Sequence, residues 1–345
     1  IETNDQVKEI LARLDGNDFL VEQVERKERK RNAPLPYTTS TMQMDAANKI
    51  NFRTRKTMMV AQQLYEGVSL GTGGTQGLIT YMRTDSTRIS PVAQAQAAEF
   101  ITERFGSKYS KHSNKVKNAS GAQDAHEAIR PSNVNLTPES IAKYLDKDQL
   151  RLYTLIWNRF VASQMAAAVF DTMSVRLGQN GVIFAANGSQ IKFDGYMAVY
   201  NDADKNKMLP EMSEGDTVVR TATTPEQHFT QPPARYSEAT LIKTLEENGV
   251  GRPSTYAPTI ETIQKRYYVK LAAKRFEPTE LGEIVNKLIV EFFPDIVNVK
   301  FTAEMEQKLD DVEIGKEQWQ KVIDGFYQPF KVELSKAEEQ MEKIQ

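Results

Sequence analysis

The feature that most constrains the fold is a change of hydrophobic period in the middle of the chain. Within residues 171–236 the helical spacing stops, and the segments 172–177, 182–186 and 217–222 are predicted as strands. The first two flank Gly178-Gln179-Asn180-Gly181, a turn signal typical of antiparallel strands. The flanking segments 39–170 and 237–345 place apolar residues at helical spacing instead. We therefore predict a multidomain α+β fold with one small antiparallel β domain and two mainly helical domains.

The order of these segments predicts a discontinuous β domain. The apolar residues that begin at Phe19 favour an early strand, which would join the later β region and make the helical block an insertion. The predicted domains are residues 1–38 together with 171–236, residues 39–170, and residues 237–345.

Several helices are predicted from capping residues and apolar spacing. Their expected ranges are 5–14, 39–50, 54–66, 91–105 after the cap Ser90, 148–168, and a helix that Thr279 caps and Pro294 ends. In the helix over 148–168, the residues expected to face inward are Leu152, Leu155, Ile156, Phe160 and Val161.

Composition excludes several classes of site. The 345 residues contain no cysteine and three histidines, which excludes disulfides, thiol catalysis and zinc ribbons and disfavours a site with several histidines. No apolar run is long enough to cross a membrane, so no membrane partner is expected. The net charge of −2 gives no support for a nucleic-acid partner by itself.

A glycine-rich loop precedes the most informative segment. Residues 71–77 are rich in glycine, but no Gly-Lys-Ser/Thr follows, so ATP chemistry has no support. Tyr81 and Arg83 come next, and in an extended segment they would project to the same side. A guanidinium beside a phenol could stabilise a phenolate and bind a phosphodiester. The alternative interpretation is an ordinary edge tyrosine with a solvated arginine.

Two further segments carry phosphate-binding residue types. If residues 124–130 are helical, His126 and Arg130 would share one face, although a plain helix end before Pro131 is the alternative. Residues 249–256 place Arg252 and two hydroxyls before a helix N-terminus, with a helix–loop–helix turn capped by Ser254 as the alternative. The pair Asp202 and Asp204 is interpreted as a solvated turn, so no metal site is predicted.

Together these residues favour phosphodiester transesterification through a phosphotyrosine. Tyrosine recombinases and type IB topoisomerases share that chemistry, but they place the tyrosine after their Arg and His residues, whereas Tyr81 comes first here.

At this point the sequence resembles the type IA DNA topoisomerases, and bacterial DNA topoisomerase I in particular. Residues 77–86, Gly-Leu-Ile-Thr-Tyr-Met-Arg-Thr-Asp-Ser, are similar to the active-site signature of that family. Further motifs in the family's order lie at residues 36–43, 56–59, 61–67, 125–131 and 251–256.

The resemblance implies the roles of individual residues. Tyr81 would be the nucleophile that forms a 5′-phosphotyrosyl link, with Arg83 stabilising the phosphate and the phenolate. It implies the catalytic residues Tyr81, Arg83 and His126, and the DNA-binding residues Arg130, Glu127, Asp85, Ser86, Arg252, Ser254, Thr255 and Tyr256.

The resemblance also implies an architecture and a cofactor. The family core is a torus in which a β-rich hinge domain lets the tyrosine domain lift as a DNA gate. The complete enzyme would use Mg²⁺ bound by an N-terminal toprim domain that does not precede Ile1, and the zinc ribbons of many members are also missing. We therefore expect a truncated core with no cofactor bound to this chain.

The function implied is the relaxation of negative supercoils, with this fragment inactive alone. The expected partners are single-stranded and negatively supercoiled DNA, the expected state is a monomer, and the expected location is the bacterial cytoplasm at the nucleoid. A non-catalytic single-stranded DNA clamp is the alternative, and a Tyr81→Phe change separates the two. A tyrosine recombinase is the third hypothesis, and the side of the phosphate that carries the adduct separates it from the first.

Overall fold

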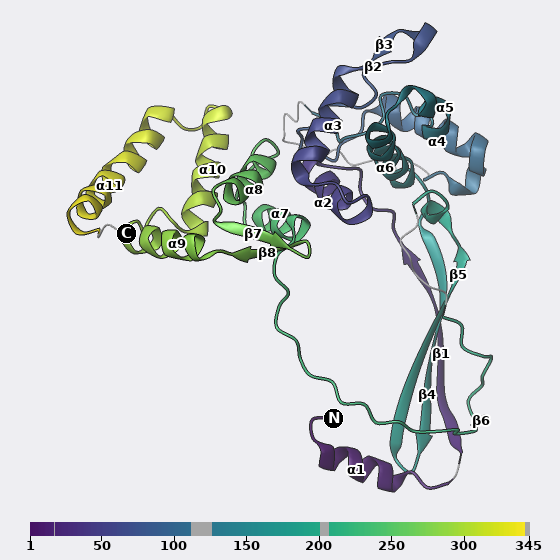
Figure 1. Ribbon diagram of the computed structural model, residues 1–345. Helices are drawn as coiled ribbons and strands as arrows, with labels where there is room; N and C mark the ends of the chain where they lie inside the picture. Colours follow the sequence, from purple (N-terminus) through teal and green to yellow (C-terminus); the bar gives the residue numbers. More distant parts are fainter. Residues whose placement is uncertain (17, 112–125, 201–206, 342–345) are drawn as a thin grey trace. The chain divides into compact units, whose positions relative to one another are not determined.

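The computed structural model describes residues 1–16, 18–111, 126–200 and 207–341. It combines helices with antiparallel sheets, which confirms the predicted α+β class (Figure 1). Among these residues, no helix is both long and apolar enough to span a lipid bilayer.

The chain divides into two compact units. The first contains Ile1–Leu35, Pro91–Ala119 and Val161–Pro232, and the second contains Pro36–Ser90, Ser120–Phe160 and Pro233–Gln345. The division into three domains that the sequence indicates stays a prediction.

The first unit is built on a four-stranded antiparallel sheet with the order β5-β4-β1-β6. Its strands are β1 (Phe19–Arg31), β4 (Ala168–Gln179), β5 (Val182–Phe193) and β6 (Thr217–Val218). β1 pairs with β4 from Leu20 opposite Gly178 to Arg31 opposite Ala168, so the predicted pairing of the early strand is confirmed. Because Arg31 lies opposite Ala168, the chain leaves and re-enters the sheet at neighbouring strand ends.

The long hairpin of β4 and β5 confirms the turn signal in the sequence. Gln179 pairs with Val182, which leaves Asn180 and Gly181 as a two-residue loop with φ of 48° and 72°. Positive φ at both loop residues is the type I′ turn that matches the twist of paired strands, and Asn-Gly is the pair that adopts it most easily.

A small apolar cluster lies at this hairpin. The helix α1 (Asn4–Arg13) packs Ile10 and Leu11 against the cluster of Leu14, Phe19 and Val182. The unit also contains α4 (Pro91–Phe105), which begins and ends as predicted, and the short helices η2 (Ser107–Tyr109) and η4 (Gly195–Ala198).

The second unit begins with two helices at the predicted positions, α2 (Thr39–Lys49) and α3 (Thr54–Glu66). They are followed by β2 (Val68–Ser69), η1 (Gly71–Gly73), β3 (Thr75–Gln76), α5 (Pro138–Ile141), η3 (Ala142–Tyr144) and α6 (Lys147–Ser163). The five side chains predicted to face inward from α6 are all buried. α6 ends at Ser163 rather than at residue 168, because Ala168 already pairs with β1.

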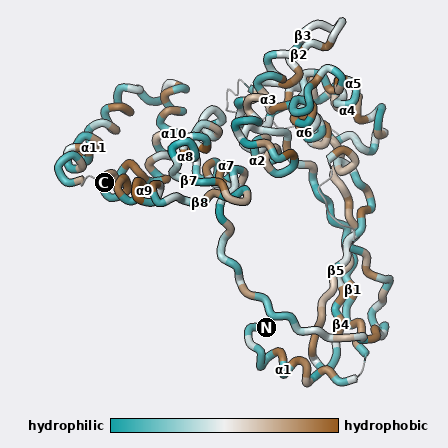
Figure 2. The backbone as a smooth tube through the Cα atoms, viewed as in Figure 1, coloured by the Kyte–Doolittle hydropathy of each residue, from teal (hydrophilic) through white to brown (hydrophobic). Residues whose placement is uncertain are grey.

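The last hundred residues form a helical layer with one hairpin. Its elements are α7 (Glu238–Glu247), α8 (Tyr256–Lys265), β7 (Val269–Ala272), β8 (Arg275–Pro278), α9 (Glu280–Phe292), α10 (Val299–Glu313) and α11 (Trp319–Gln340). Apolar residues dominate α9 (Figure 2), although Phe292 is its only buried residue. A core of Ile242, Tyr256, Ile260 and Phe276 joins α7, α8 and β8, and Met44 of α2 packs against it.

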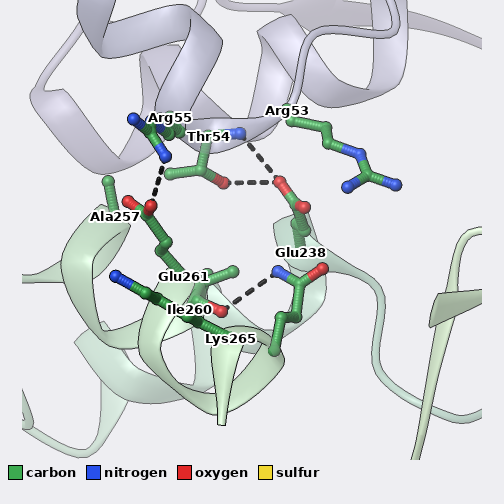
Figure 3. A pocket seen from close by; sticks show the side chains of 9 residues that line it. Arg53, Thr54, Arg55, Glu238, Ala257, Ile260, Glu261 and Lys265 are labelled. Carbon is green, nitrogen blue, oxygen red and sulfur yellow. Dashed lines mark hydrogen bonds and ion pairs between the residues drawn. The ribbon is translucent and has the colours of Figure 1, made fainter. Parts of the chain in front are cut away.

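A carboxylate of α7 caps the N-terminus of α3. Arg53 is the N-cap residue of α3, but its side chain makes no capping bond. The backbone N–H of Thr54 and its Oγ1 both donate to Glu238 Oε2, over 2.7 and 2.8 Å (Figure 3). Both residues are buried, and a negative charge at a helix N-terminus is favourable. Beside this contact, at a cavity of about 460 Å³, Arg55 pairs with Glu261 of α8.

We predict that Glu238→Ala lowers the free energy of unfolding by about 1–2 kcal/mol, as the loss of a helix cap does. Denaturant unfolding of the two proteins measures the difference. Glu247→Ala is the matched control, since that glutamate lies on the same helix but is exposed and makes only a 3.7 Å pair with Lys243. An equal effect of both changes would contradict the capping role.

Candidate active site

The segment that carries Tyr81 follows β3 and packs tightly on α3. A Cβ atom on Gly77 would lie 2.6 Å from the carbonyl oxygen of Tyr65, so only glycine fits there. Leu78 N–H donates to Leu64 O over 2.8 Å, and Ile79 forms a β-bridge with Pro131.

The segment is not the regular extended strand that the sequence reasoning assumed, because the backbone bends at Met82 and Arg83. Burial nevertheless alternates along it. Met82 and Thr84 are buried, Tyr81 is half-buried and Arg83 is exposed. Tyr81 and Arg83 are thus both accessible, while the residue between them anchors the backbone.

Thr39, the first residue of α2, holds this bend from one side. Its Oγ1 donates to Met82 O over 2.7 Å and accepts from the N–H of Thr84 over 2.9 Å. Its own backbone N–H, which has no acceptor within the helix, donates to Thr84 O over 2.9 Å. All three residues are buried, so these bonds are shielded from water.

Thr80 holds the other side of Tyr81. Its Oγ1 donates to Ala128 O over 2.7 Å and accepts from Arg130 N–H over 3.0 Å, and its own N–H donates to Arg130 O. The backbone is therefore held on both sides of the tyrosine, by Thr39 of α2 at residues 82–84 and through Thr80 by residues 128–130.

Two aromatic rings lie against the ring of Tyr81. The ring of Tyr65 meets it edge-on with centroids 5.3 Å apart, and the ring of His126 lies 5.5 Å away at 40°. The structure therefore brings together Tyr81 and His126, both predicted as site residues. Sequence reasoning gave no role to Tyr65, although it lies in one of the family-like motifs.

The segment that carries His126 is extended, and the helix considered for residues 124–130 is wrong in its described part, residues 126–130. Ile129 bridges to Tyr37, and Ala128 N–H donates to Arg88 O. The cause is local, since a residue before proline, here Arg130, is disfavoured in helical conformation. Asp124 and Ala125 of the same motif lie outside the described residues.

Glu127 and Arg130 form an ion pair beside the tyrosine segment. The Arg130 Nε donates to Glu127 Oε2 over 2.7 Å, and both side chains are largely buried. Burial opposes ionisation of Glu127, but the bond and charge of Arg130, with Ser90, outweigh it and lower the pKa of the carboxyl group. Glu127 thus fixes the guanidinium of Arg130, whose backbone is bonded to Thr80 next to the predicted nucleophile.

The other two site residues of the tyrosine motif differ in exposure. Asp85 is exposed, whereas Ser86 is 4% exposed. The Ser86 Oγ accepts from Arg88 N–H over 3.2 Å, and its N–H donates to Thr84 Oγ1. The hydroxyl of Ser86 therefore shapes the local turn and does not stand at the surface.

The loop between α7 and α8 carries the third predicted group. Gly249 and Gly251 adopt φ of 70° and 83°. Ser254 and Thr255 are exposed, and Thr255 rather than Ser254 is the N-cap residue of α8. Thr255 Oγ1 accepts from Arg252 N–H over 2.8 Å, which closes the loop.

Arg252 points to α10 rather than to open surface. Its Nε and Nη2 donate to the two carboxylate oxygens of Asp310, over 3.2 and 2.6 Å. The hydrogen bond and charge of Asp310 raise the pKa of the Arg252 guanidinium.

Tyr256 is 6% exposed and belongs to the core of the second unit. Burial raises the pKa of Tyr256 to about 12, and the charges of Glu246 and Asp85 act in the same direction against that of Arg252. The charge of Asp85, in the tyrosine segment, therefore acts on the first residue of α8. Ser40 of α2 binds the end of α7, since its Oγ donates to Glu246 Oε1 over 2.6 Å.

The described residues contain no group of three His, Cys, Asp or Glu side chains that could hold a metal ion. The pair Asp202 and Asp204, interpreted from sequence as a solvated turn, lies outside those residues.

The tyrosine segment is fixed by the hydrogen bonds of Thr39 and Thr80, and it lies beside a histidine and a buried arginine–glutamate pair. This arrangement agrees with the family that the motifs indicate. The chain belongs to the type IA DNA topoisomerase family: it matches the family described as DNA topoisomerase over residues 1–324. Its structure is similar to that of full-length topoisomerase I from Thermotoga maritima, with a TM-score of 0.86 and 40% sequence identity. The similarity covers 96% of this chain and 54% of the Thermotoga chain, so the chain spans about half the length of that relative.

We predict that Thr39→Val destabilises the protein by about 2 kcal/mol, because a buried acceptor and a buried donor lose their partner. Thr102→Val is the control, since its exposed hydroxyl bonds only to Ala98 O within α4. Denaturant unfolding should show a loss below about 0.5 kcal/mol for the control. Equal losses in the free energy of unfolding would show that the buried hydrogen bonds of Thr39 stabilise the protein no more than the exposed one of Thr102.

We also predict that Tyr256 makes stability fall in alkaline solution. Its folded pKa of about 12 exceeds the value of about 10 of an unfolded tyrosine, so the contribution is full below pH 10 and is lost as the pH rises toward 12. The free energy of unfolding of the wild type should fall by about 2 kcal/mol more than that of Tyr256→Phe over this range. The prediction would be wrong if the free energy of unfolding of the wild type and that of Tyr256→Phe fell in parallel as the pH rises.

Proposed function

We propose that Tyr81 is the nucleophile of a type IA DNA topoisomerase that relaxes negatively supercoiled DNA. The observation that carries the proposal is the placement of Tyr81, accessible and in ring contact with His126, in a chain of this family. Its phenolic oxygen attacks a backbone phosphorus, the bond from phosphorus to the 3′-oxygen breaks, and the phenolic proton ends on that oxygen. The product is a 5′-phosphotyrosyl link and a free 3′-hydroxyl group.

Resealing is the reverse reaction, in which the 3′-hydroxyl group attacks the same phosphorus. The energy of the broken phosphodiester is kept in the phosphotyrosyl bond, so no ATP is required. This agrees with a glycine-rich loop that no Gly-Lys-Ser/Thr follows.

The cationic side chains have separate proposed roles around this phosphate. Arg83 is exposed beside the nucleophile and would neutralise charge on the phosphate and the phenolate. His126 lies against the Tyr81 ring, where it can contact the phosphate. Arg130, oriented by Glu127, would bind a neighbouring phosphate. Ser254, Thr255 and Arg252 would hold the single strand, with Asp85 as a further residue of that surface. Tyr256 would support the surface from the core beneath it.

Magnesium is the proposed cofactor of the complete enzyme, held by carboxylates of a toprim domain. It would neutralise phosphate charge during cleavage and resealing. No described set of side chains in this chain fits that ion, so we expect this chain alone to bind single-stranded DNA weakly and not to relax plasmids.

The proposal includes the toroidal architecture and the gate of the family, in which the strands of the first unit act as the hinge. The protein would act as a monomer in the cytoplasm, at the bacterial nucleoid. Non-catalytic clamping of single-stranded DNA is the rival function, and it predicts no covalent intermediate.

We predict that Tyr81→Phe abolishes covalent attachment to a labelled single-stranded oligonucleotide, because the attacking oxygen is gone while the ring is kept. The assay uses the full-length gene product with magnesium, stopped with detergent and resolved on a denaturing gel. Binding of the oligonucleotide should change less than about twofold, since the hydroxyl adds no charge.

Tyr65→Phe is the matched control, because it deletes the same group from the neighbouring ring and should keep the adduct. An adduct that survives Tyr81→Phe would contradict the assignment of the nucleophile. A wild-type protein that binds the oligonucleotide and never forms an adduct would favour the clamp.

A further inference from the structure

The guanidinium of Arg252 is almost fully occupied inside the protein. Of its five N–H groups, the Nε and one Nη2 group bind the carboxylate of Asp310, and Nη1 donates to Gly249 O over 3.3 Å and to Gly251 O over 2.8 Å. Glu306 adds a second carboxylate 3.9 Å from Nη1. One N–H group remains for any external ligand.

The contact with Asp310 has the geometry that arginine uses for phosphate. Two parallel N–H···O bonds from one guanidinium edge to two oxygens of one anion form the fork that binds carboxylates and phosphates alike. A phosphodiester that bound Arg252 in this way would need the same edge that Asp310 now holds.

The position of the pair allows exchange. The side chain of Arg252 is 29% exposed and that of Asp310 is 44% exposed. A single DNA strand lying on the exposed Ser254 and Thr255 can therefore reach Arg252 and Asp310. A partly exposed ion pair of this kind is weak, because water solvates both partners when they separate.

We propose that Asp310 occupies the place of a DNA phosphate on Arg252, and that single-stranded DNA binds this loop by displacing the carboxylate. The inference rests on the proposed function and deepens it, since it makes Asp310 the positioning residue that controls the arginine. Without DNA, Asp310 holds the guanidinium against α10 in a fixed orientation. With DNA, the phosphate replaces it and Asp310 turns to water.

The experiment measures the dissociation constant of a fluorescent oligothymidylate over a series of salt concentrations. Asp310→Asn removes the competing charge, so binding should tighten about two- to fivefold, as expected when exchange no longer breaks a partly exposed ion pair. The slope of log affinity against log salt should stay the same, because after the exchange the wild type makes the same phosphate contact on Arg252. Asp310→Glu keeps the anion and should bind as the wild type does.

Asp311→Asn is the matched control. Asp311 is the next residue of α10, is similarly half-exposed, and its carboxylate lies near Gln307. Asp311→Asn removes the same charge without freeing Arg252. Its affinity should therefore change less than that of Asp310→Asn, and its salt slope should equal that of the wild type. Arg252→Ala should lower the salt slope by about 0.7, and adding Asp310→Asn to it should change the affinity no more than Asp311→Asn does.

Two results would overturn the inference. Equal behaviour of Asp310→Asn and Asp311→Asn would reduce the effect to general charge, and weaker binding by a folded Asp310→Asn protein would show that Asp310 only supports the loop. Thermal unfolding of each variant establishes that it is folded. If neither the wild type nor any variant binds the oligonucleotide, the DNA surface in the proposed function fails as well, whereas failure of the exchange alone leaves that surface in place.

Discussion

The site depends on the hydrogen bonds between Thr39 and the bend at Met82–Thr84. They use a backbone N–H that the start of α2 leaves free, and a hydroxyl that donates to one carbonyl and accepts from one amide. Because these groups are buried, releasing the bend would leave polar groups unpaired away from water. Thr80 repeats the arrangement on the other side of the tyrosine. The backbone is therefore fixed on both sides of a tyrosine whose side chain is partly exposed, and an attacking side chain needs both a fixed position and access.

Most of the fold could be predicted from the sequence where the signal is local. The inward residues of α6 repeat at helical spacing, and Asn180-Gly181 fits only a tight turn between strands. The hairpin of β7 and β8 was missed because its turn residues, Ala273 and Lys274, adopt φ of 47° and 64° without the Gly or Asn that marks such turns. α10 was not predicted individually. Phe301, Met305 and Val312 repeat at helical spacing in it, but many charged residues lie between them and none of its residues is buried.

The candidate site could be predicted in its residue types but not in its contacts. The motif around Tyr81 indicates the proposed nucleophile. The approach of His126 follows from a β-bridge and hydrogen bonds to distant residues, which spacing cannot show. The partner of Arg252 lies 58 residues away on α10, the helix that was not predicted individually. Ser86 was assigned to DNA by the motif, yet its hydroxyl serves the turn that it belongs to. These differences have one cause. Whether a polar side chain binds a ligand or another part of the protein depends on which groups the folded chain brings within reach.

In the proposed reaction, the oxygen of Tyr81 becomes bonded to the 5′ phosphate of a cleaved strand. The most direct measurement is mass spectrometry of peptides from protein trapped with a single-stranded oligonucleotide of defined sequence. The account predicts one modified peptide, containing residues 77–88, whose nucleotide is attached to Tyr81 through its 5′ phosphate. A nucleotide attached through a 3′ phosphate, or carried by another residue, would contradict it.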